Sequence, residues 1–404
     1  MQRQEHPGSG AGRARPSSQS VRCRWRSLGR MDDARKAQAP IKGRGAASRI
    51  AGRFEKSTTH GVDDGWGSVY EELADAPRPR TQVTEERARS IISRNDSPDI
   101  GFSQSVNPYR GCEHGCVYCF ARPSHAYLDL SPGLDFETRL YAKTNTAEQL
   151  RRELSRPGYV PSTIALGINT DAYQPIERDH RITRDTLELL AQCRHPVSFV
   201  TKSALIERDL DVLVRMAGQR LVNVYFSVTT LDNRLSGRME PRAAAPHARL
   251  RAMRALADAG VPVGVLVAPV VPMITDAELE HILEAAHAHG ARSASYVLLR
   301  LPHELKDLWR EWLQLHYPER AAHVMSLVQQ MRGGRDYDST FGKRMRGEGP
   351  FAQLIAQRFA KAHARLGFGR LPPLDASAFV APDAPPRAPK PPKAAPPSPQ
   401  GQLF

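Results

Sequence analysis

Short apolar runs alternate with helical patterns through the middle of the chain, and this alternation restricts the fold more than any other feature. The expected buried strands are residues 162–168, 197–201, 221–228, 261–268 and 293–301. The expected helices between them are residues 146–155, 183–193, 209–217, 246–259 and 276–289. Gly260 and Gly290 stand where helix C-caps are expected. Such repeats build a parallel sheet, either doubly wound or curled into a full or partial barrel, so we predict an α/β fold.

The flanking regions differ in composition from this middle part. Residues 1–85 are basic, rich in Arg, Gly, Ser and Ala and without sustained periodicity, so we predict a largely disordered arm. The barrel is expected in residues 86–301 and a helical C-terminal extension in residues 302–371, with helices at residues 305–316, 319–331 and 351–366. Residues 372–404 are rich in Pro and Ala, which favours an extended tail. Either Met1 or Met31 could be the start of the natural protein.

The charge of the chain is concentrated in its first part. The formal net charge is +14, and Lys and Arg outnumber Asp and Glu by 14 to 4 in residues 1–60. Such an arm suits contact with nucleic acid, although a solvated extension explains it equally well. No stretch approaches the roughly 18 apolar residues of a membrane span, and no apolar segment of a secretory signal is present at the N-terminus. We therefore expect a cytoplasmic protein without a membrane partner, and the oligomeric state stays open.

The most informative segment contains three of the five cysteines, in the order C-x3-C-x2-C: Cys112, Cys116 and Cys119. Gly111 and Gly115 allow the tight turns that would point three thiolates at one inorganic centre. A fully ligated four-iron cluster uses four cysteines, so three leave one iron open to another ligand.

Zinc is the alternative metal for this segment, with His114 or His125 as the fourth ligand. It is less favoured, because zinc ligands usually come as two separated pairs. The other two cysteines, Cys23 and Cys193, stand alone and are predicted to be bystanders in a reducing compartment.

This cysteine spacing, with the aromatic Tyr118 before the third cysteine, resembles the signature of the radical SAM superfamily. From about Thr84 to Leu301 the chain resembles the branch related to spore photoproduct lyase. Within that branch it is most similar to an uncharacterised bacterial subgroup, with which it shares the run from Asn107 to Asp135, including Phe120 to Tyr127. The resemblance implies a partial (β/α)6 TIM-like barrel with the cluster in the loop after the first strand.

The resemblance also implies a chemistry. A [4Fe-4S] cluster would cleave S-adenosyl-L-methionine reductively to give a 5′-deoxyadenosyl radical, with an electron from an external flavodoxin- or ferredoxin-type donor. Spore photoproduct lyase carries a cysteine that returns a hydrogen atom to its product, and no cysteine occurs at the corresponding residues 164–169. That particular reaction is therefore not expected.

Four residues resemble cofactor-binding positions of this branch: Tyr118, Lys202, Ser227 and Glu240. Lys202 and Ser227 follow apolar strand residues at the barrel rim, where ligands bind. A surface ion pair is the alternative for Lys202, and an ion pair with Arg242 is the alternative for Glu240. No residue is assigned a catalytic role beyond the cofactors.

Other polar residues are weaker candidates. Asn169 and Asp171 follow another strand and could face a substrate or adenosine, or simply form a turn. His303 and Tyr337 could lie on the substrate side, although most such residues are structural. A basic cluster in the extension could meet a phosphate backbone or be a solvated surface; it consists of Arg332, Arg335, Lys343, Arg344 and Arg346.

The leading hypothesis is a radical SAM enzyme acting on nucleic acid, with a lyase-like or DNA repair-like reaction. Radical SAM modification of RNA, protein or a metabolite is one alternative, and a noncatalytic, metal-stabilised nucleic-acid-binding protein is another. The chain ends in Gln400-Gly-Gln402-Leu403-Phe404, which resembles the peptides that dock on the bacterial sliding clamp. A flexible tether with two apolar anchors suits capture in a groove, so the clamp is a candidate partner.

Overall fold

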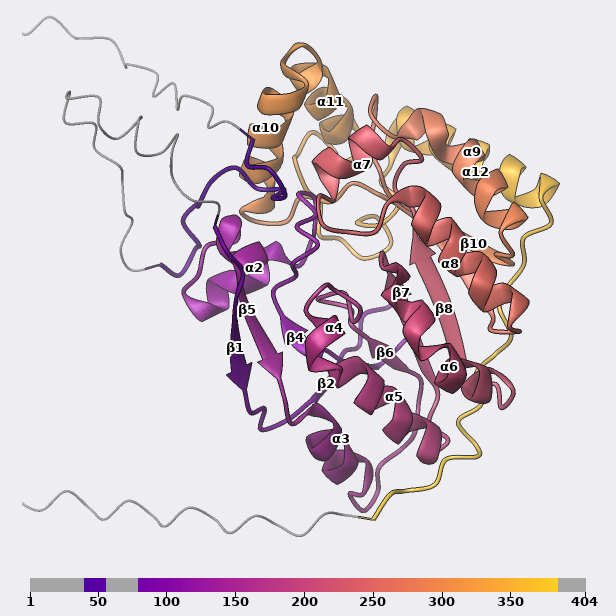
Figure 1. Cartoon of the computed structure of the whole chain (residues 1–404). Helices are drawn as coiled ribbons and strands as arrows, with labels where there is room; N and C mark the ends of the chain where they lie inside the picture. The colour runs from indigo at the N-terminus through magenta and orange to yellow at the C-terminus, as the bar shows by residue number, and fades with distance from the viewer. Residues whose placement is uncertain (1–39, 56–78, 384–404) are drawn as a thin grey trace, which may run out of the picture. The chain divides into compact units, whose positions relative to one another are not determined.

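The computed structural model describes residues 40–55 and 79–383, and its centre is a seven-stranded sheet (Figure 1). The strand order is β10-β9-β8-β7-β6-β3-β2, in which all neighbours are parallel except β2 and β3. The strands are β2 (Ile92–Arg94), β3 (Gln104–Val106), β6 (Ile164–Leu166), β7 (Val197–Thr201), β8 (Val222–Ser227), β9 (Val263–Val270) and β10 (Ser293–Leu298). Within the described residues β2 and β10 are the edge strands and do not pair with each other, so the predicted partial barrel is confirmed and it is open.

Helices connect the parallel strands and pack beside one another along the outside of the sheet (Figure 1). They are α3 (Thr146–Leu154), α4 (Glu177–His180), α5 (Ile182–Gln192), η2 (Ala204–Asp209), α6 (Leu210–Ala217), α7 (Asn233–Met239), α8 (Pro246–Asp258), η3 (Asp276–Glu278) and α9 (Leu279–Ala288). Pro246 begins α8, because its fixed φ suits the first helical turn. Gly260 and Gly290 follow their helices with φ of 82° and 95°, which confirms the predicted helix ends.

All five predicted strands and all five predicted connecting helices are present, with ends that differ by a few residues. The first strand of the barrel, β3, was not predicted. It has only three residues, Gln104-Ser105-Val106, and two of them are polar. Parallel pairing with β6 gives it a strand conformation that its own composition does not favour.

A second, three-stranded sheet supports the region around the cysteines. Its order is β1-β5-β4, formed by β1 (Gln82–Glu86), β5 (Arg139–Lys143) and β4 (Tyr109–Arg110). The 3₁₀ helix η1 (Arg122–Leu128) and helix α2 (Leu134–Thr138) lie between β4 and β5 in the chain. This sheet and these helices form the frame into which the cysteine loop is built.

Residues 40–55 pack against this frame, although sequence analysis assigns them to the disordered arm. The backbone amides of Gly45 and Ala46 donate hydrogen bonds of 3.0 and 2.8 Å to the carboxylate of Glu137. A Cβ atom at Gly45 would lie 1.8 Å from the carbonyl oxygen of Gly115. The small residues that make this stretch look featureless are therefore what allows its backbone to approach the cysteine loop.

The predicted helical extension is confirmed as α10 (Leu305–His316), α11 (Pro318–Gln330) and α12 (Gly349–Arg365). Trp309 and Trp312 are buried in it with their rings stacked at 4.9 Å. After α12 the chain is extended through residue 383, and Phe379 packs against the rings of Tyr159 and His195. Cys193 is buried nearby, and its carbonyl accepts a hydrogen bond from Val380.

Several predictions fall on residues that the structure does not describe. They are the bulk of the basic arm, Cys23, the choice between Met1 and Met31, and the clamp-like peptide at residues 400–404. No helix within residues 40–55 and 79–383 is long and apolar enough to cross a membrane.

The buried position of His195 predicts that the folded protein loses stability in mild acid. Its Nε2 lies 2.8 Å from the Tyr159 hydroxyl and its Nδ1 lies 3.1 Å from the Pro196 carbonyl. Burial lowers the pKa of His195 from 6.5 to about 4. Between these values the unfolded chain binds a proton that the folded chain excludes, so the free energy of unfolding should fall by about 1.4 kcal/mol per pH unit. Above the unfolded pKa both states are neutral, and this contribution is constant.

Urea unfolding at pH 7.5 and pH 5.0 measures this effect. His195→Gln should lose less stability between the two pH values than the wild type, whereas the exposed His247→Gln should behave like the wild type. Equal pH dependence in the wild type and His195→Gln would contradict the prediction.

Candidate active site

The three cysteines lie on one tight loop that follows β3 and the short β4. Cys112 and Cys116 are both 7% exposed, while Cys119 is half-buried. Gly111 and Gly115 have φ of 73° and 68°, as the predicted turns require. A Cβ at Gly111 would lie 2.8 Å from the Phe136 carbonyl oxygen, and one at Gly115 would lie 2.7 Å from the Glu137 carboxylate. No other residue type fits these two turns without displacing the frame.

The electrostatics of the thiols fit a multinuclear iron cluster. Burial raises the pKa of Cys112 well above 9, and Asp171 and the neighbouring cysteines raise it further. Burial also raises the pKa of Cys116 to about 12, although Lys202 opposes this. The two buried thiols of Cys112 and Cys116 become thiolates together only if bound cations compensate their charge, which a metal centre would do.

Each of the two histidines considered as zinc ligands uses one ring nitrogen in a contact within the protein. His114 Nδ1 lies 3.4 Å from Asp171 Oδ2, and His125 Nε2 lies 2.9 Å from the Arg139 carbonyl. Throughout the described part of the chain, no group of three or more His, Cys, Asp or Glu side chains could hold one metal ion. A cubane cluster places its thiolates on different irons, so its ligands need not converge on one point.

A fully buried ion pair lies directly under the cysteine loop. Arg122 Nε donates to the carbonyl of Cys116 (2.8 Å), and Nη2 donates to the carbonyl of Gly115 (3.1 Å). The same Nη2 pairs with the carboxylate of Glu137, and both side chains are 0% exposed. Glu137 also accepts the amide hydrogen bonds of residues 45 and 46. One ion pair thus ties together the cysteine loop, α2 and the N-terminal segment.

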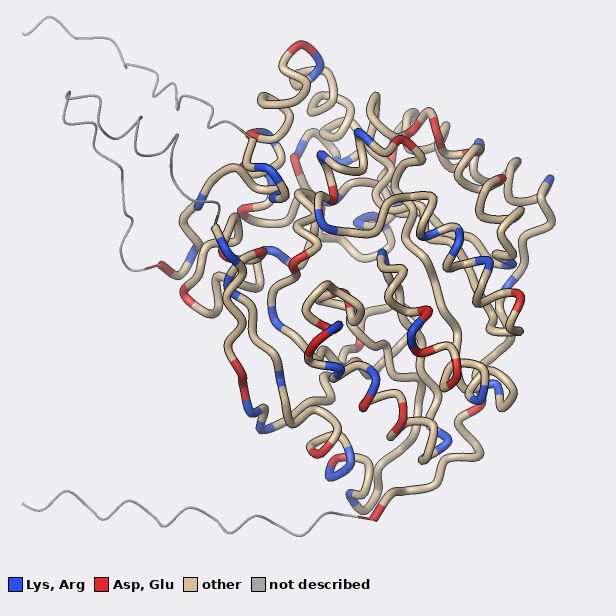
Figure 2. Tube along the Cα trace, in the orientation of Figure 1, with Lys and Arg blue, Asp and Glu red and all other residues tan. Residues whose placement is uncertain are grey.

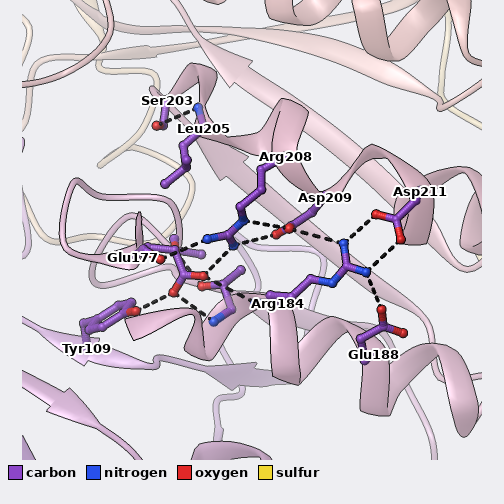
Figure 3. Close-up of polar contacts among 11 residues, drawn as sticks. Tyr109, Glu177, Arg184, Glu188, Ser203, Leu205, Arg208, Asp209 and Asp211 are labelled. Carbon is purple, nitrogen blue, oxygen red and sulfur yellow. Dashed lines mark hydrogen bonds and ion pairs between the residues drawn. The ribbon is translucent and has the colours of Figure 1, made fainter. Parts of the chain in front are cut away.

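A second network fixes the residue that leads into the loop (Figure 3). The buried Tyr109 hydroxyl donates to Glu177, which also accepts hydrogen bonds from Arg208 Nη2 (2.7 Å) and the Thr183 amide (2.9 Å). Burial, and the nearby Glu177 carboxylate, raise the pKa of Tyr109, so it stays a neutral donor. Arg208 Nε also pairs with Asp209 at 2.8 Å (Figure 3). The network holds β4 to α4 and η2.

Tyr118 and Glu240 contact each other, an arrangement that sequence analysis does not predict. Glu240 accepts hydrogen bonds from the Tyr118 hydroxyl, from Thr229 Oγ1 at 2.7 Å and from Arg249 Nη2. Burial alone would raise the pKa of Glu240, but Arg249 and Lys202 lower it to about 2. The proposed pairing of Glu240 with Arg242 is wrong. Because α8 brings Arg249 to Glu240, Arg242 is left to pair with Glu113 at 3.0 Å.

Lys202 lies beside this network and is not part of a surface ion pair. Its Nζ is 5.7 Å from the centre of the Tyr118 ring, and no hydrogen bond to Nζ is found among the described residues. Its amide donates to Asp171 Oδ2 at 2.7 Å. Burial tends to lower the pKa of Lys202, but Cys116 and Glu240 raise it, so the group remains a cation.

Ser227 lies at the end of β8 and Asp171 lies after β6. Ser227 Oγ donates to the Ala268 carbonyl at 3.2 Å, and its own carbonyl accepts from Arg249 Nη1 at 3.0 Å. Asp171 accepts hydrogen bonds from Thr201 (2.8 Å) and holds His114, so the structure assigns it to joining loops. Tyr118, Lys202, Ser227 and Glu240 are therefore gathered beside the cysteine loop. Their contact with a cofactor stays a prediction.

The comparisons with known proteins agree with this geometry. The family model described as the radical SAM superfamily matches residues 106–286. The uncharacterized protein Rv2578c of Mycobacterium tuberculosis is 38% identical over 232 residues, which are 57% of this chain and 68% of that protein. The chain belongs to the radical SAM superfamily. The uncharacterized protein MJ0683 of Methanocaldococcus jannaschii is 24% identical and covers 59% of this chain and 85% of its own length.

Solved structures share the fold of this radical SAM protein. A mutant of spore photoproduct lyase superposes with a TM-score of 0.52 at 15% identity, covering 78% of this chain and 87% of the lyase. Another mutant, with bound AdoMet and dinucleoside spore photoproduct, has a TM-score of 0.51 at 16% identity and covers 71% and 80%. These structures show the shared fold. Membership of the radical SAM superfamily makes the protein a radical SAM enzyme, with a [4Fe-4S] cluster and S-adenosylmethionine as its cofactors.

The basic residues of the extension do not form one free cluster. Arg332 is buried and donates to the carbonyls of Leu299 and Lys343. Lys343 pairs with Glu348 and Arg344 pairs with Asp99, whereas Arg335 and Arg346 are exposed. His303 is exposed, while Tyr337 is half-buried near the two guanidinium groups of Arg300 and Arg332.

Sequence analysis missed Arg122, Glu137 and Arg249 as parts of the site. A signal existed for Arg249, because it falls on the apolar stripe of α8 together with Met253 and Leu256. Arg122 lies within the run that resembles the bacterial subgroup, but nothing in its spacing reveals the partner Glu137. That pairing depends on tertiary structure alone.

The Arg122–Glu137 pair predicts a large effect of a single substitution. Arg122→Met leaves a carboxylate buried without its cation and frees two loop carbonyls, so the free energy of unfolding should fall by about 3–5 kcal/mol. The iron content after anaerobic reconstitution should fall as well. Arg87→Met, which removes an exposed pair with Glu148, should change stability by less than about 1 kcal/mol. Full iron loading and wild-type stability in Arg122→Met would show that the pair does not hold the loop.

Proposed function

We propose that this radical SAM enzyme acts on nucleic acid, in a repair-like or lyase-like reaction on a damaged or modified base. The observation that carries the proposal is a cation at the cluster loop. Arg300 is half-buried, is near enough to Cys119 to sense its charge, and forms no carboxylate ion pair among the described residues. Among the described residues its one hydrogen bond goes to Met345 Sδ at 2.9 Å. The nearby Asp99 carboxylate forms its ion pair with Arg344 instead. A half-buried guanidinium without an ion pair of its own favours an anionic substrate at this position.

Other features support the same substrate class. The basic arm suits attraction to phosphates, and a structure of the same fold was obtained with a dinucleoside photoproduct bound. Over the described residues, basic and acidic positions are interspersed along the trace (Figure 2). The lyase's cysteine-dependent step is not proposed, because residues 164–169 contain no cysteine.

The residues around the loop divide into two roles in this proposal. Lys202 Nζ is the cation free to bind the carboxylate of S-adenosylmethionine, and the Ser227 hydroxyl lies at the strand end where a ribose can be bound. Glu240 is fully occupied by Tyr118, Thr229 and Arg249, so it positions Tyr118. When bound, the cluster and S-adenosylmethionine supply a carbon radical that abstracts hydrogen from the substrate.

Two partners complete the proposal. An external flavodoxin- or ferredoxin-type donor would supply the electron, since the described chain offers a three-cysteine site for a single cluster. A sliding clamp would recruit the enzyme through residues 400–404, which lie outside the described residues. The cysteines fit a reducing compartment such as the cytoplasm.

Formation of 5′-deoxyadenosine tests the proposal. The anaerobically reconstituted protein should form it after reduction with S-adenosylmethionine, Cys116→Ala should form none, and Cys193→Ala should equal the wild type. Ultraviolet-damaged or modified oligonucleotides of DNA and RNA should raise the rate several-fold and yield a base of altered mass. A rate that no nucleic acid changes, with no altered base, would rule out this substrate class while leaving the radical chemistry intact.

A further inference from the structure

The exposed aromatic rings of the described chain share one feature. Four such rings are more than two-fifths exposed: Phe54 (51%), Phe120 (43%), Tyr127 (72%) and Phe341 (55%). An arginine guanidinium lies over each of them. Arg53 is 5.2 Å from the Phe54 ring centre and 5.5 Å from that of Tyr127, Arg300 is 4.7 Å from that of Phe120, and Arg344 is 4.7 Å from that of Phe341. Planar cations stacked in this way hold a ring in a fixed orientation.

Contacts join the first two rings to the region of the cluster loop. The rings of Phe54 and Tyr127 lie 5.1 Å apart. Arg53 Nη2 donates to the Pro123 carbonyl at 3.4 Å, and Nη1 pairs with Glu304 at 3.3 Å. This arginine therefore links the N-terminal segment, η1 and the loop after β10.

The surface continues from the cluster loop into the extension. Phe120 directly follows the third cysteine of the motif and carries Arg300 over its face. Arg300 Nη1 donates to Met345 Sδ, and Met345 is the neighbour of Arg344, which stacks on Phe341. The exposed rings thus form two groups, Phe54 with Tyr127 and Phe120 with Phe341, which are joined by the short stretch of chain from Phe120 to Pro123 directly after the third cysteine.

The far end of this series is held in place. The amide of Gly342 donates to Asp99 Oδ1 at 2.6 Å, and Arg344 Nε pairs with Asp99 Oδ2 at 2.5 Å. The Leu298 amide, at the end of β10, donates to the Met345 carbonyl at 3.0 Å. Phe341 therefore sits on a segment fixed both to β10 and to the turn after β2.

We propose that this surface binds the unpaired nucleotides of a single-stranded nucleic acid and leads them past the cluster loop. We call it the arginine-aromatic track and define it by Arg53, Phe54, Phe120, Tyr127, Arg300, Phe341 and Arg344. The inference rests on the proposed function, in which the substrate is nucleic acid. Successive bases stack on exposed rings whatever their sequence, whereas the bases of a duplex are already stacked on one another.

The charges of the three arginines in the track give them two different roles. Arg53 and Arg344 are balanced by Glu304 and Asp99, so they act mainly by fixing the rings. Arg300 has no carboxylate partner among the described residues and is the cation available to a phosphate. A small metabolite would use one ring beside the cluster, and would not require two groups of exposed rings.

Binding of two labelled oligonucleotides to the full chain tests the track. One is a thymidine 12-mer, and the other has the same phosphates and sugars but no bases. The basic arm attracts both equally, so the ratio of their dissociation constants reports base stacking alone. Fluorescence anisotropy should give a ratio of at least tenfold for the wild type. Phe341→Ala should reduce this ratio of dissociation constants roughly 5- to 100-fold, or to one if base stacking is lost completely. The double substitution Phe54→Ala, Tyr127→Ala should have an effect of the same size.

Leu354→Ala is the matched control, since Leu354 is 48% exposed on α12 and outside the track. It should leave the ratio unchanged, and thermal unfolding should show that all the variants fold. The same experiment is repeated with single-stranded RNA and with a duplex of the same length. The duplex should bind no better than the abasic strand. A wild-type ratio near one, or equal ratios in Phe341→Ala and Leu354→Ala, would overturn the track. If nucleic acid still stimulated 5′-deoxyadenosine formation, the proposed function would survive that result.

Discussion

The buried pair of Arg122 and Glu137 is the interaction on which the rest of the site depends. A loop that must hold an anionic metal cluster has few apolar side chains of its own to bury, so its backbone carbonyls have to be fixed from below. Arg122 does this with fixed, planar donors, and Glu137 neutralises the buried charge. The same carboxylate recruits a distant segment of the chain, so one charged pair organises three pieces of backbone.

The charged side chains around the cysteines are of two kinds, those that are paired within the protein and those that are not. Glu240, Arg249 and Tyr118 form a closed, satisfied network, and within the described residues the Lys202 ammonium group beside it forms no hydrogen bond. Arg300 contacts the Phe120 ring and Met345 Sδ but forms no carboxylate ion pair in the same part of the chain. The satisfied groups fix the geometry, and the unsatisfied cations mark the places where anionic ligands would be bound.

Sequence analysis predicted the strands and helices that have a clear apolar periodicity and recognisable end residues. Strands such as β9 and helices such as α8 were found because their apolar periodicity is strong and their ends carry Pro and Gly. Strand β3 was missed, because three residues with two polar side chains carry no periodicity. The spacing of Cys112, Cys116 and Cys119 was enough to select them as candidate ligands, but no spacing indicated Arg122 or Arg249. Their partners lie on other elements, and only tertiary structure brings Glu137 and Glu240 to them.

The close approach of Gly45 to the carbonyl of Gly115 ties cluster retention to the beginning of the chain. A protein whose synthesis starts at Met31 keeps every contact of residues 40–55, whereas one shortened beyond residue 55 exposes the underside of the cysteine loop to water. Glu137 would then lose two of its backbone donors. Burial of the cysteine loop therefore depends in part on residues whose composition gives no hint of it.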